Sequence, residues 1–238
     1  MKRTLLISTA LSAVLAQGAF AADLPTKKGP PPAPAPVYAP FSWTGFYIGA
    51  NVGGLWSSDG VTDLDPFYYG EIPGNSNTLN PSGVVGGLQA GYNYQIQQFV
   101  LGVEGDVDWS SASGKFSFPG APAIATHSTS LPFFADLRGR AGYAFDRFLP
   151  YLTGGVVFAN VKNNLADPDY GFSFGRGGES TGWTVGAGLE YAIDNHWSVK
   201  GEYLYMQFPD VTKTWDYNYS FKFKDSAQVA RVGLNYRF

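Results

Sequence analysis

The final ten residues of the chain, 229–238, alternate between an apolar face and a mainly polar face. The apolar face consists of Ala230, Val232, Leu234, Tyr236 and Phe238. Arg231, Asn235 and Arg237 occupy the intervening positions. A strand of this kind, ending in an aromatic residue, is typical of the last strand of a transmembrane β-barrel, where one face meets lipid and the other meets the lumen. Soluble half-buried strands also alternate, so the interpretation depends on the rest of the chain.

The N-terminus has the pattern of a secretory signal peptide. Lys2 and Arg3 precede an apolar run over residues 5–20, and Ala19-Phe20-Ala21 has the small-x-small form of a cleavage site. We predict that residues 1–21 are removed and that the mature chain is exported. A membrane anchor fits less well, because polar residues interrupt the run and it falls short of the roughly 20 residues of a spanning helix. Cleavage changes the net charge from −3 to −5, which is no signature of nucleic-acid binding.

Residues 22–42 are rich in proline, with the sequence PTKKGPPPAPAPVYAP over positions 25–40. Proline lacks the backbone N–H that helices and sheets need, so we predict an extended periplasmic tether. A docking site for a periplasmic partner is the alternative. The remaining residues, 43–238, are predicted to form one barrel domain.

Eight segments of alternating hydrophobicity follow at regular intervals. They span about 44–57, 83–96, 99–110, 131–145, 149–163, 182–193, 196–208 and the terminal strand. Long polar connections at 58–82, 111–130, 164–181 and 209–225 alternate with short turns. No apolar run after residue 21 could form a membrane helix, so strands must do any spanning. The pattern predicts an all-β fold, an eight-stranded antiparallel up-and-down transmembrane β-barrel. The fifth strand could turn either Tyr151, Thr153 and Val157 or Leu152, Val156 and Phe158 toward lipid.

The tryptophans sort by strand end. Those at the long-loop ends are Trp56, Trp109 and Trp183, those at the short-turn ends are Trp43 and Trp197, and Trp215 falls in a loop. Because the amphipathic indole ring prefers the headgroup level, we expect two aromatic belts that face lipid. A soluble lipocalin-type barrel with its apolar face inward is the structural rival. The belts and the terminal Phe238 favour an outward apolar face.

The opposite, inward face carries charges of both signs. The central set is Glu104, Asp106, Asp136, Arg138, Arg140, Glu190, Lys200, Glu202 and Arg231. The tight turn near residue 195 sets Glu190 opposite Lys200, and pairing Glu104 with Arg140 would set Asp106 opposite Arg138. An eight-stranded barrel is just wide enough for side chains to fill it. We therefore predict a salt-bridged lumen that conducts poorly.

The segment Phe41-Ser42-Trp43-Thr44-Gly45-Phe46-Tyr47-Ile48-Gly49 resembles the opening motif of alphaproteobacterial outer-membrane immunogenic proteins, porin-family surface antigens with OmpA-like barrels. The Pro-rich leader, Thr153-Gly154-Gly155 and the terminal Tyr-Arg-Phe are similar as well. The resemblance implies a bacterial outer-membrane location and insertion by the barrel-assembly machinery, which would read Tyr236 and Phe238. It also implies a structural or envelope-integrity role and immune visibility. Pore activity and haem binding are associated with some members.

Several functions compete at this level. A small-solute porin is the first alternative to a structural barrel. A surface receptor or adhesin is the second, because aromatic and charged clusters lie at 65–69 and 213–219 and solvent-facing aromatics often mark contact surfaces. His127, placed in a long loop, is a weak haem-ligand candidate, whereas His196 lies on the short-turn side.

An enzyme is not expected, nor is a bound cofactor or metal. The chain has 2 His and 0 Cys, which excludes disulfides and thiolate sites and leaves little from which to build a nucleophile and its base. The expected partners are outer-membrane lipid, the assembly machinery and a host or surface ligand on the loops, with no nucleic acid. Both termini are expected in the periplasm and the long loops outside the cell.

Overall fold

The computed structural model of the chain describes residues 41–63, 76–117, 126–167, 172–215 and 219–238. The predicted signal peptide, all but the last two residues of the predicted tether and the aromatic cluster at 65–69 lie outside these residues. The described part is all β. Its strands are β1 (Gly45–Asp63), β2 (Ser76–Leu79), β3 (Ser82–Ile96), β4 (Phe99–Ser110), β5 (Ser113–Ser117), β6 (Thr126–Tyr143), β7 (Phe148–Asp167), β8 (Phe172–Ala192), β9 (Trp197–Gln207), β10 (Val211–Trp215) and β11 (Tyr219–Arg237).

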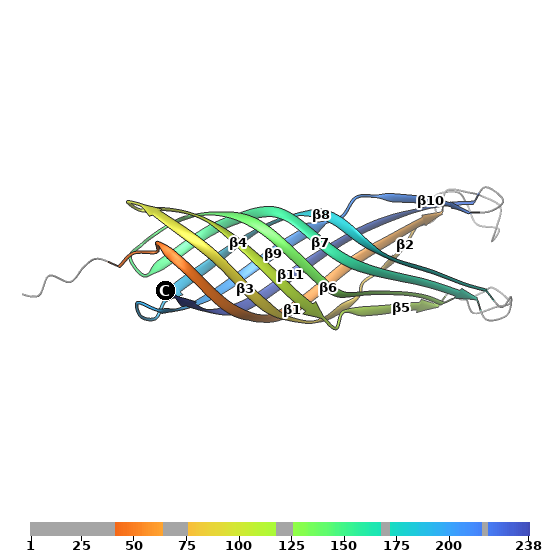
Figure 1. Cartoon of the computed structure of the whole chain (residues 1–238). Helices are drawn as coiled ribbons and strands as arrows, with labels where there is room; N and C mark the ends of the chain where they lie inside the picture. Colours follow the sequence, from red (N-terminus) through yellow and green to blue (C-terminus); the bar gives the residue numbers. More distant parts are fainter. Residues whose placement is uncertain (1–40, 64–75, 118–125, 168–171, 216–218) are drawn as a thin grey trace, which may run out of the picture. The chain divides into compact units, whose positions relative to one another are not determined.

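The eight long strands form a closed antiparallel barrel, which confirms the predicted fold class (Figure 1). Neighbours along the wall follow the order β1-β3-β4-β6-β7-β8-β9-β11, and β11 returns to pair with β1. Tyr47 shows the closure, because it lies opposite Gly91 of β3 on one side and opposite Arg237 of β11 on the other. Three tight turns, the start of β1 and the C-terminus lie at one end of the barrel, the short-turn end. Among the described residues, no helix is long and apolar enough to cross a membrane.

The strands are amphipathic with the apolar face outward. Leu152 of β7 is 68% exposed while its neighbour Tyr151 is 4% exposed, and the same contrast recurs along the other long strands. The Leu152, Val156 and Phe158 set therefore faces outward in the fifth long strand, and the Tyr151, Thr153 and Val157 set faces the interior. This arrangement is the opposite of a lipocalin-type barrel.

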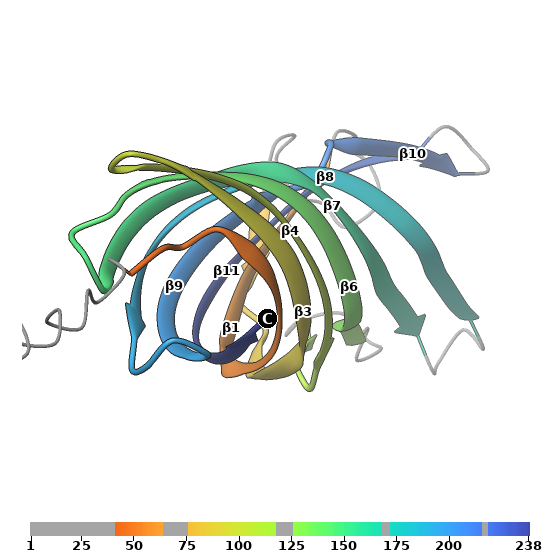
Figure 2. The same cartoon turned by 60° about the vertical axis from the view of Figure 1, so that its left-hand side comes forward.

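The predicted long loops are wrong in part, because strands continue far into them. β1 runs to Asp63, and β6 begins at Thr126, so His127 lies in a strand. β7 and β8 pair as far as Asp167 opposite Phe172, while β10 ends at Trp215 and pairs with β11. Backbone hydrogen bonds account for these extensions, since a hairpin leaving the barrel rim pairs its own strands without needing an apolar face (Figure 2).

Four tryptophans confirm the predicted belts and a fifth contradicts them. Trp56, Trp109, Trp183 and Trp197 are 41–54% exposed on the outer face. Trp43 is fully buried, at 0% exposure, inside the short-turn end. It precedes β1, so the alternation of that strand does not govern its direction.

The interior is layered along the barrel axis. An apolar cluster at the short-turn end contains Trp43, Val100, Ala144, Leu149 and Ala192. Charged residues occupy the middle. A second apolar cluster lies toward the long-loop end and includes Leu55, Val85, Phe134, Leu204, Met206 and Val229. The charged layer is thus enclosed between two apolar layers.

Candidate functional site: an ion-pair network inside the barrel

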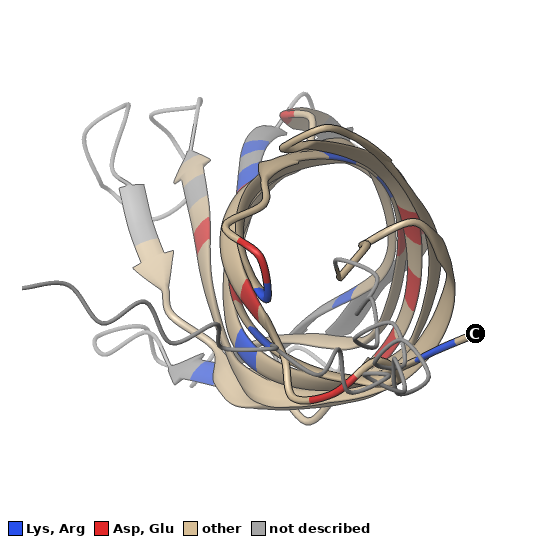
Figure 3. Ribbon diagram, turned by 90° about the vertical axis from the view of Figure 1, so that its left-hand side faces the viewer, with Lys and Arg blue, Asp and Glu red and all other residues tan. Residues whose placement is uncertain are grey.

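All nine predicted central charges are buried in the barrel interior. They occupy alternate positions at the middle of β4, β6, β8, β9 and β11, so the pleat of each strand directs them inward. Figure 3, which looks along the barrel, shows these charged positions along its wall. With Asp108 they form one ion-pair network that joins six carboxylates to four cations.

Arg138 is the centre of the network. Its guanidinium donates to Glu104 at 2.7 Å, to Asp106 and Asp136 at 2.6 Å each, and to Glu202 at 2.9 Å. These carboxylates come from three strands, β4, β6 and β9. The planar fork of Arg presents five donors in fixed directions, which suits it to this multiple pairing.

The other cations bridge the same carboxylates to further strands. Arg231 of β11 donates to Asp106 at 2.8 Å, Asp108 at 2.9 Å and Glu202 at 2.7 Å. Lys200 of β9 lies 2.8 Å from Glu104. The contact between Arg231 and Glu202 joins neighbouring strands, whereas those of Arg231 with Asp106 and Asp108 and of Lys200 with Glu104 join strands that are not neighbours. The network therefore ties distant parts of the barrel wall together.

Arg140 forms the part of the network nearest the short-turn end. It donates to Glu190 at 2.7 Å and lies 3.7 Å from Glu104. Its guanidinium also stacks 4.0 Å from the ring centroid of Tyr151. Ser198 at 2.6 Å and Asn235 at 2.9 Å donate to the other oxygen of Glu190.

The cross-strand register differs from the conditional prediction by two residues. Glu104 lies opposite Arg138, while Arg140 lies opposite Gly102. Asp106 lies opposite Asp136, and this like-charged pair is tolerable because Arg138 binds both carboxylates. Glu190 is opposite Lys200 as the tight turn predicts, yet each of the two makes its ion pair across the lumen with another residue.

Two tyrosines complete the network and were missed by the sequence analysis. Tyr47 donates its hydroxyl to Glu104 at 2.7 Å and accepts from Arg140 at 3.1 Å. Tyr151 donates to Glu202 at 3.0 Å. The sequence could have indicated the role of Tyr47, because this residue alternates with the outward Phe46 and Ile48 and so points inward. A buried tyrosine hydroxyl usually has a hydrogen-bond partner. For Tyr151 the phase of the strand was open.

The network holds no set of groups that sequence or geometry marks as catalytic. Every cation in it is bound to carboxylates, and no cluster of three or more His, Cys, Asp or Glu suited to a metal ion occurs among the described residues. His196 stacks on Tyr236 outside the lumen. His127 pairs with Phe116 and Leu165 in the strand ladder of the loop-side extension.

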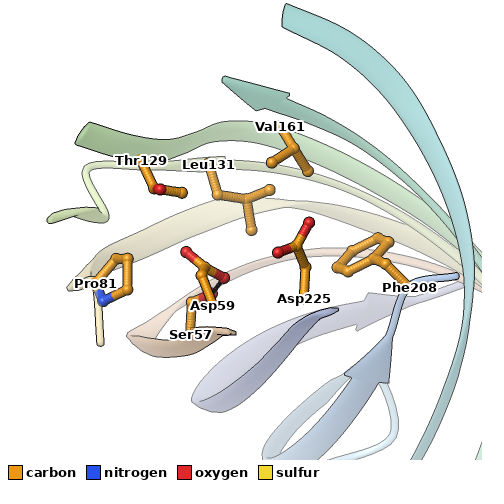
Figure 4. Close-up of a pocket in the computed structure, with 8 residues that line it drawn as sticks. All are labelled: Ser57, Asp59, Pro81, Thr129, Leu131, Val161, Phe208 and Asp225. Carbon is orange, nitrogen blue, oxygen red and sulfur yellow. Dashed lines mark hydrogen bonds between the residues drawn. The ribbon is translucent and has the colours of Figure 1, made fainter. Parts of the chain in front are cut away.

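A small cavity opens on the loop side of the second apolar cluster (Figure 4). It has about 10 Å³ of space and is lined by Ser57, Asp59, Pro81, Thr129, Leu131, Val161, Phe208 and Asp225. Asp59 lies beyond Trp56, past the apolar outer band of β1, and opposite Asp225 of β11. Burial, together with the nearby charge of Asp225, raises the pKa of Asp59 to about 7, although the Ser57 hydroxyl that donates to it at 2.6 Å opposes the shift.

Outward apolar strands, aromatic belts and a polar interior together define a transmembrane β-barrel. The chain matches the family described as outer membrane protein beta-barrel domain over residues 32–238, and it belongs to that family. It is therefore an outer-membrane protein.

Two similar proteins are named outer-membrane immunogenic proteins. The chain is 37% identical over 244 residues to the 31 kDa outer-membrane immunogenic protein of Brucella melitensis biotype 1, with 100% of both chains covered. It is 32% identical over 240 residues to the 25 kDa outer-membrane immunogenic protein of Brucella abortus biovar 1, covering 100% of this chain and 99% of the relative.

Solved structures share the fold. The outer membrane protein OprG from Pseudomonas aeruginosa superposes with a TM-score of 0.50 at 15% identity, covering 82% of this chain and 96% of that one. The outer membrane protease OmpT from Escherichia coli gives a TM-score of 0.53 at 10% identity, covering 85% and 99%. At these identities the likeness shows the fold and nothing about activity.

Proposed function

We propose that this protein is a structural outer-membrane barrel and surface antigen whose lumen is closed by the ion-pair network. The observation that carries the proposal is the position of Arg138, which binds four carboxylates from three strands inside the barrel. A water-filled pore needs charges that line a wall and leave the centre open. Here the charged side chains bind one another inside the lumen, and the apolar cluster around Phe134 and Leu204 adds a layer of apolar side chains on their long-loop side.

The resemblance to immunogenic surface proteins supports the rest of the proposal. The short-turn end carries both the start of β1 and the C-terminus, so both termini face the periplasm and the hairpin extensions face outward, as in other outer-membrane barrels. The exposed Phe238 and its ring neighbour Tyr236 are the residues through which the barrel-assembly machinery would recognise the chain. The proposed role is non-enzymatic, because the charges are committed to one another.

Solute flux through vesicles tests the closure. The mature native protein, the double variant Arg138→Ala/Arg140→Ala and the control Lys222→Ala would be reconstituted in liposomes and assayed for swelling with a small sugar. Lys222 is a matched control, because its ion pair with Asp210 at 2.9 Å is exposed outside the lumen. Because Trp43 is buried in the short-turn end, Trp43→Ala is assayed alone and combined with the double variant. We expect little flux with the native protein, the control and Trp43→Ala alone, and measurable flux when Trp43→Ala is combined with the double variant. Equal flux in the native protein and in the combined variant would overturn the proposed closure, whether both are leaky or both are tight.

A further inference from the structure

Residues 41–44, here called the strap, cross the short-turn end of the barrel before β1 begins. The strap has no strand pairing of its own. Gly45 follows it with φ of 144°, a conformation that L side chains rarely adopt, and a Cβ there would lie 3.3 Å from the carbonyl oxygen of Phe238. Glycine at this position therefore allows the chain to turn from the wall of β1 into the mouth of the barrel.

Trp43 fills that mouth. It belongs to one buried apolar cluster with Val100, Ala144, Leu149 and Ala192. These four residues adjoin all three tight turns, so the cluster that contains Trp43 draws on every hairpin of the rim. The indole N–H donates to the carbonyl oxygen of Asp146 at 3.0 Å. This bond gives the buried indole nitrogen the hydrogen-bond partner that it needs.

Further contacts hold the strap in place from both sides. The backbone N–H of Trp43 donates to the side-chain oxygen of Gln95 at 2.7 Å, and the backbone N–H of Gln95 donates to the hydroxyl of Thr44 at 2.9 Å. Arg237 of the last strand donates to the carbonyl oxygen of Ser42. The Arg237 guanidinium also lies 4.8 Å from the ring centroid of Phe41 and 5.0 Å from that of Trp43.

We propose that the strap is a second closure, which seals the short-turn mouth of the barrel separately from the ion-pair network. The proposal extends the proposed closed barrel, since it places an aromatic seal in series with the charged layer. A fully buried indole that bonds to the second turn and shares a cluster with residues beside all three turns blocks the mouth, whereas a tryptophan that only anchored β1 would need contacts with one wall. A few side-chain contacts, rather than a β-ladder, keep the strap in the mouth of the barrel, so the strap can leave the mouth without unfolding the wall.

Cysteine accessibility tests the seal directly, because the chain has 0 native cysteines. Ser198 is the reporter position. It is fully buried, and it lies opposite Ala192, which belongs to the same buried cluster as Trp43. The Ser198→Cys protein in detergent micelles would be treated with a charged, water-soluble thiol reagent. It would carry the native strap, Trp43→Ala, Trp43→Phe or Trp197→Ala. The last is a matched control, since Trp197 faces outward at the same end.

We expect slow labelling with the native strap and with Trp197→Ala. Trp43→Ala should label about tenfold faster or more, because reagent access follows the population of the open mouth. Trp43→Phe should fall between them, since it keeps a ring but loses the bond to Asp146. A shift in electrophoretic mobility on boiling would establish that each barrel has folded.

Unchanged labelling in a folded Trp43→Ala barrel would overturn the seal, and so would rapid labelling with the native strap. Either failure is distinct from failure of the network proposal. The thiol assay reports access to the short-turn mouth, while the swelling assay reports passage through the whole lumen.

Discussion

At the scale of single residues, Arg138 makes the largest number of ion pairs among the described residues, with four carboxylates. Its removal leaves Glu104, Asp106, Asp136 and Glu202 with fewer cations in a site where their side chains are at most 1% exposed. Breaking a buried ion pair from one side costs on the order of 3–5 kcal/mol, because an uncompensated charge remains. We therefore expect Arg138→Ala to lower the free energy of unfolding by that order.

Urea unfolding of the protein refolded in lipid vesicles measures this loss. Lys222→Ala, which removes an exposed ion pair, should change the same quantity by less than about 1 kcal/mol. Similar small losses for both variants would mean that the central network contributes little to stability.

Asp59, which lines the loop-side cavity, should make the free energy of unfolding depend on pH. Its pKa is raised from 3.8 to about 7 in the folded protein, so the folded state holds this proton more tightly than the unfolded state does. Its contribution to stability is therefore present at low pH and is lost as pH rises toward and through about 7. Asp59→Asn should remove this dependence, and the variant should gain stability relative to the native protein between pH 5 and pH 8.

Urea midpoints at the two pH values are the measurement for Asp59. Asp210→Asn serves as the control, because Asp210 is an exposed acid whose pKa the Lys222 ammonium lowers. Parallel pH profiles for the native protein and Asp59→Asn would refute the assignment.

At the scale of elements, glycines on one strand make room for tyrosines on the next. Gly188 of β8 lies opposite Tyr151 of β7, and a Cβ on Gly188 would collide with the tyrosine ring and hydroxyl. Gly188→Ala should push Tyr151 away from Glu202 and Arg140. We expect a loss of about 1–3 kcal/mol in the free energy of unfolding, the usual cost of overpacking.

Gly201 of β9 is the matched control for this substitution. A Cβ there meets nothing within 4 Å, so Gly201→Ala should leave the free energy of unfolding near the native value. Equal effects of the two substitutions, measured by urea unfolding in vesicles, would argue against the tyrosine–glycine packing.

The outcome for individual strands shows what periodicity can and cannot predict. Alternation fixed the inward face of β4 and β6, because a one-residue slip would have put charges into lipid. It could not fix which charges oppose each other, since shifting β6 by two residues keeps Arg138 and Arg140 inward. It also could not place Trp43, which belongs to no strand, or Tyr151, whose strand is apolar on both faces.

The extensions beyond the membrane were the least predictable elements. Six of the ten residues of β5 and β10 are Ser, Thr or Lys, a composition that also suits loops. Their strand structure comes from backbone pairing with β6 and β11 rather than from burial of an apolar face. Amino-acid composition does not distinguish a strand from a loop where backbone hydrogen bonds alone form the strand.

At the scale of the whole molecule, the barrel is filled in layers. The strap, the ion-pair network and the apolar cluster around Phe134 follow one another along the interior, from the short-turn end toward the extensions. Each layer joins strands that are distant around the wall. This filling is what an eight-stranded barrel permits, because its interior has room for side chains and little else.

Single-channel recording of the pure, native mature protein in planar bilayers tests the closed barrel most directly. We expect a silent membrane across a wide range of applied voltage, since the proposed closure places three layers of side chains across the lumen. Steady, discrete conductance steps from the monomeric protein would contradict it, and the charged residues of the network would then have to line an open pore.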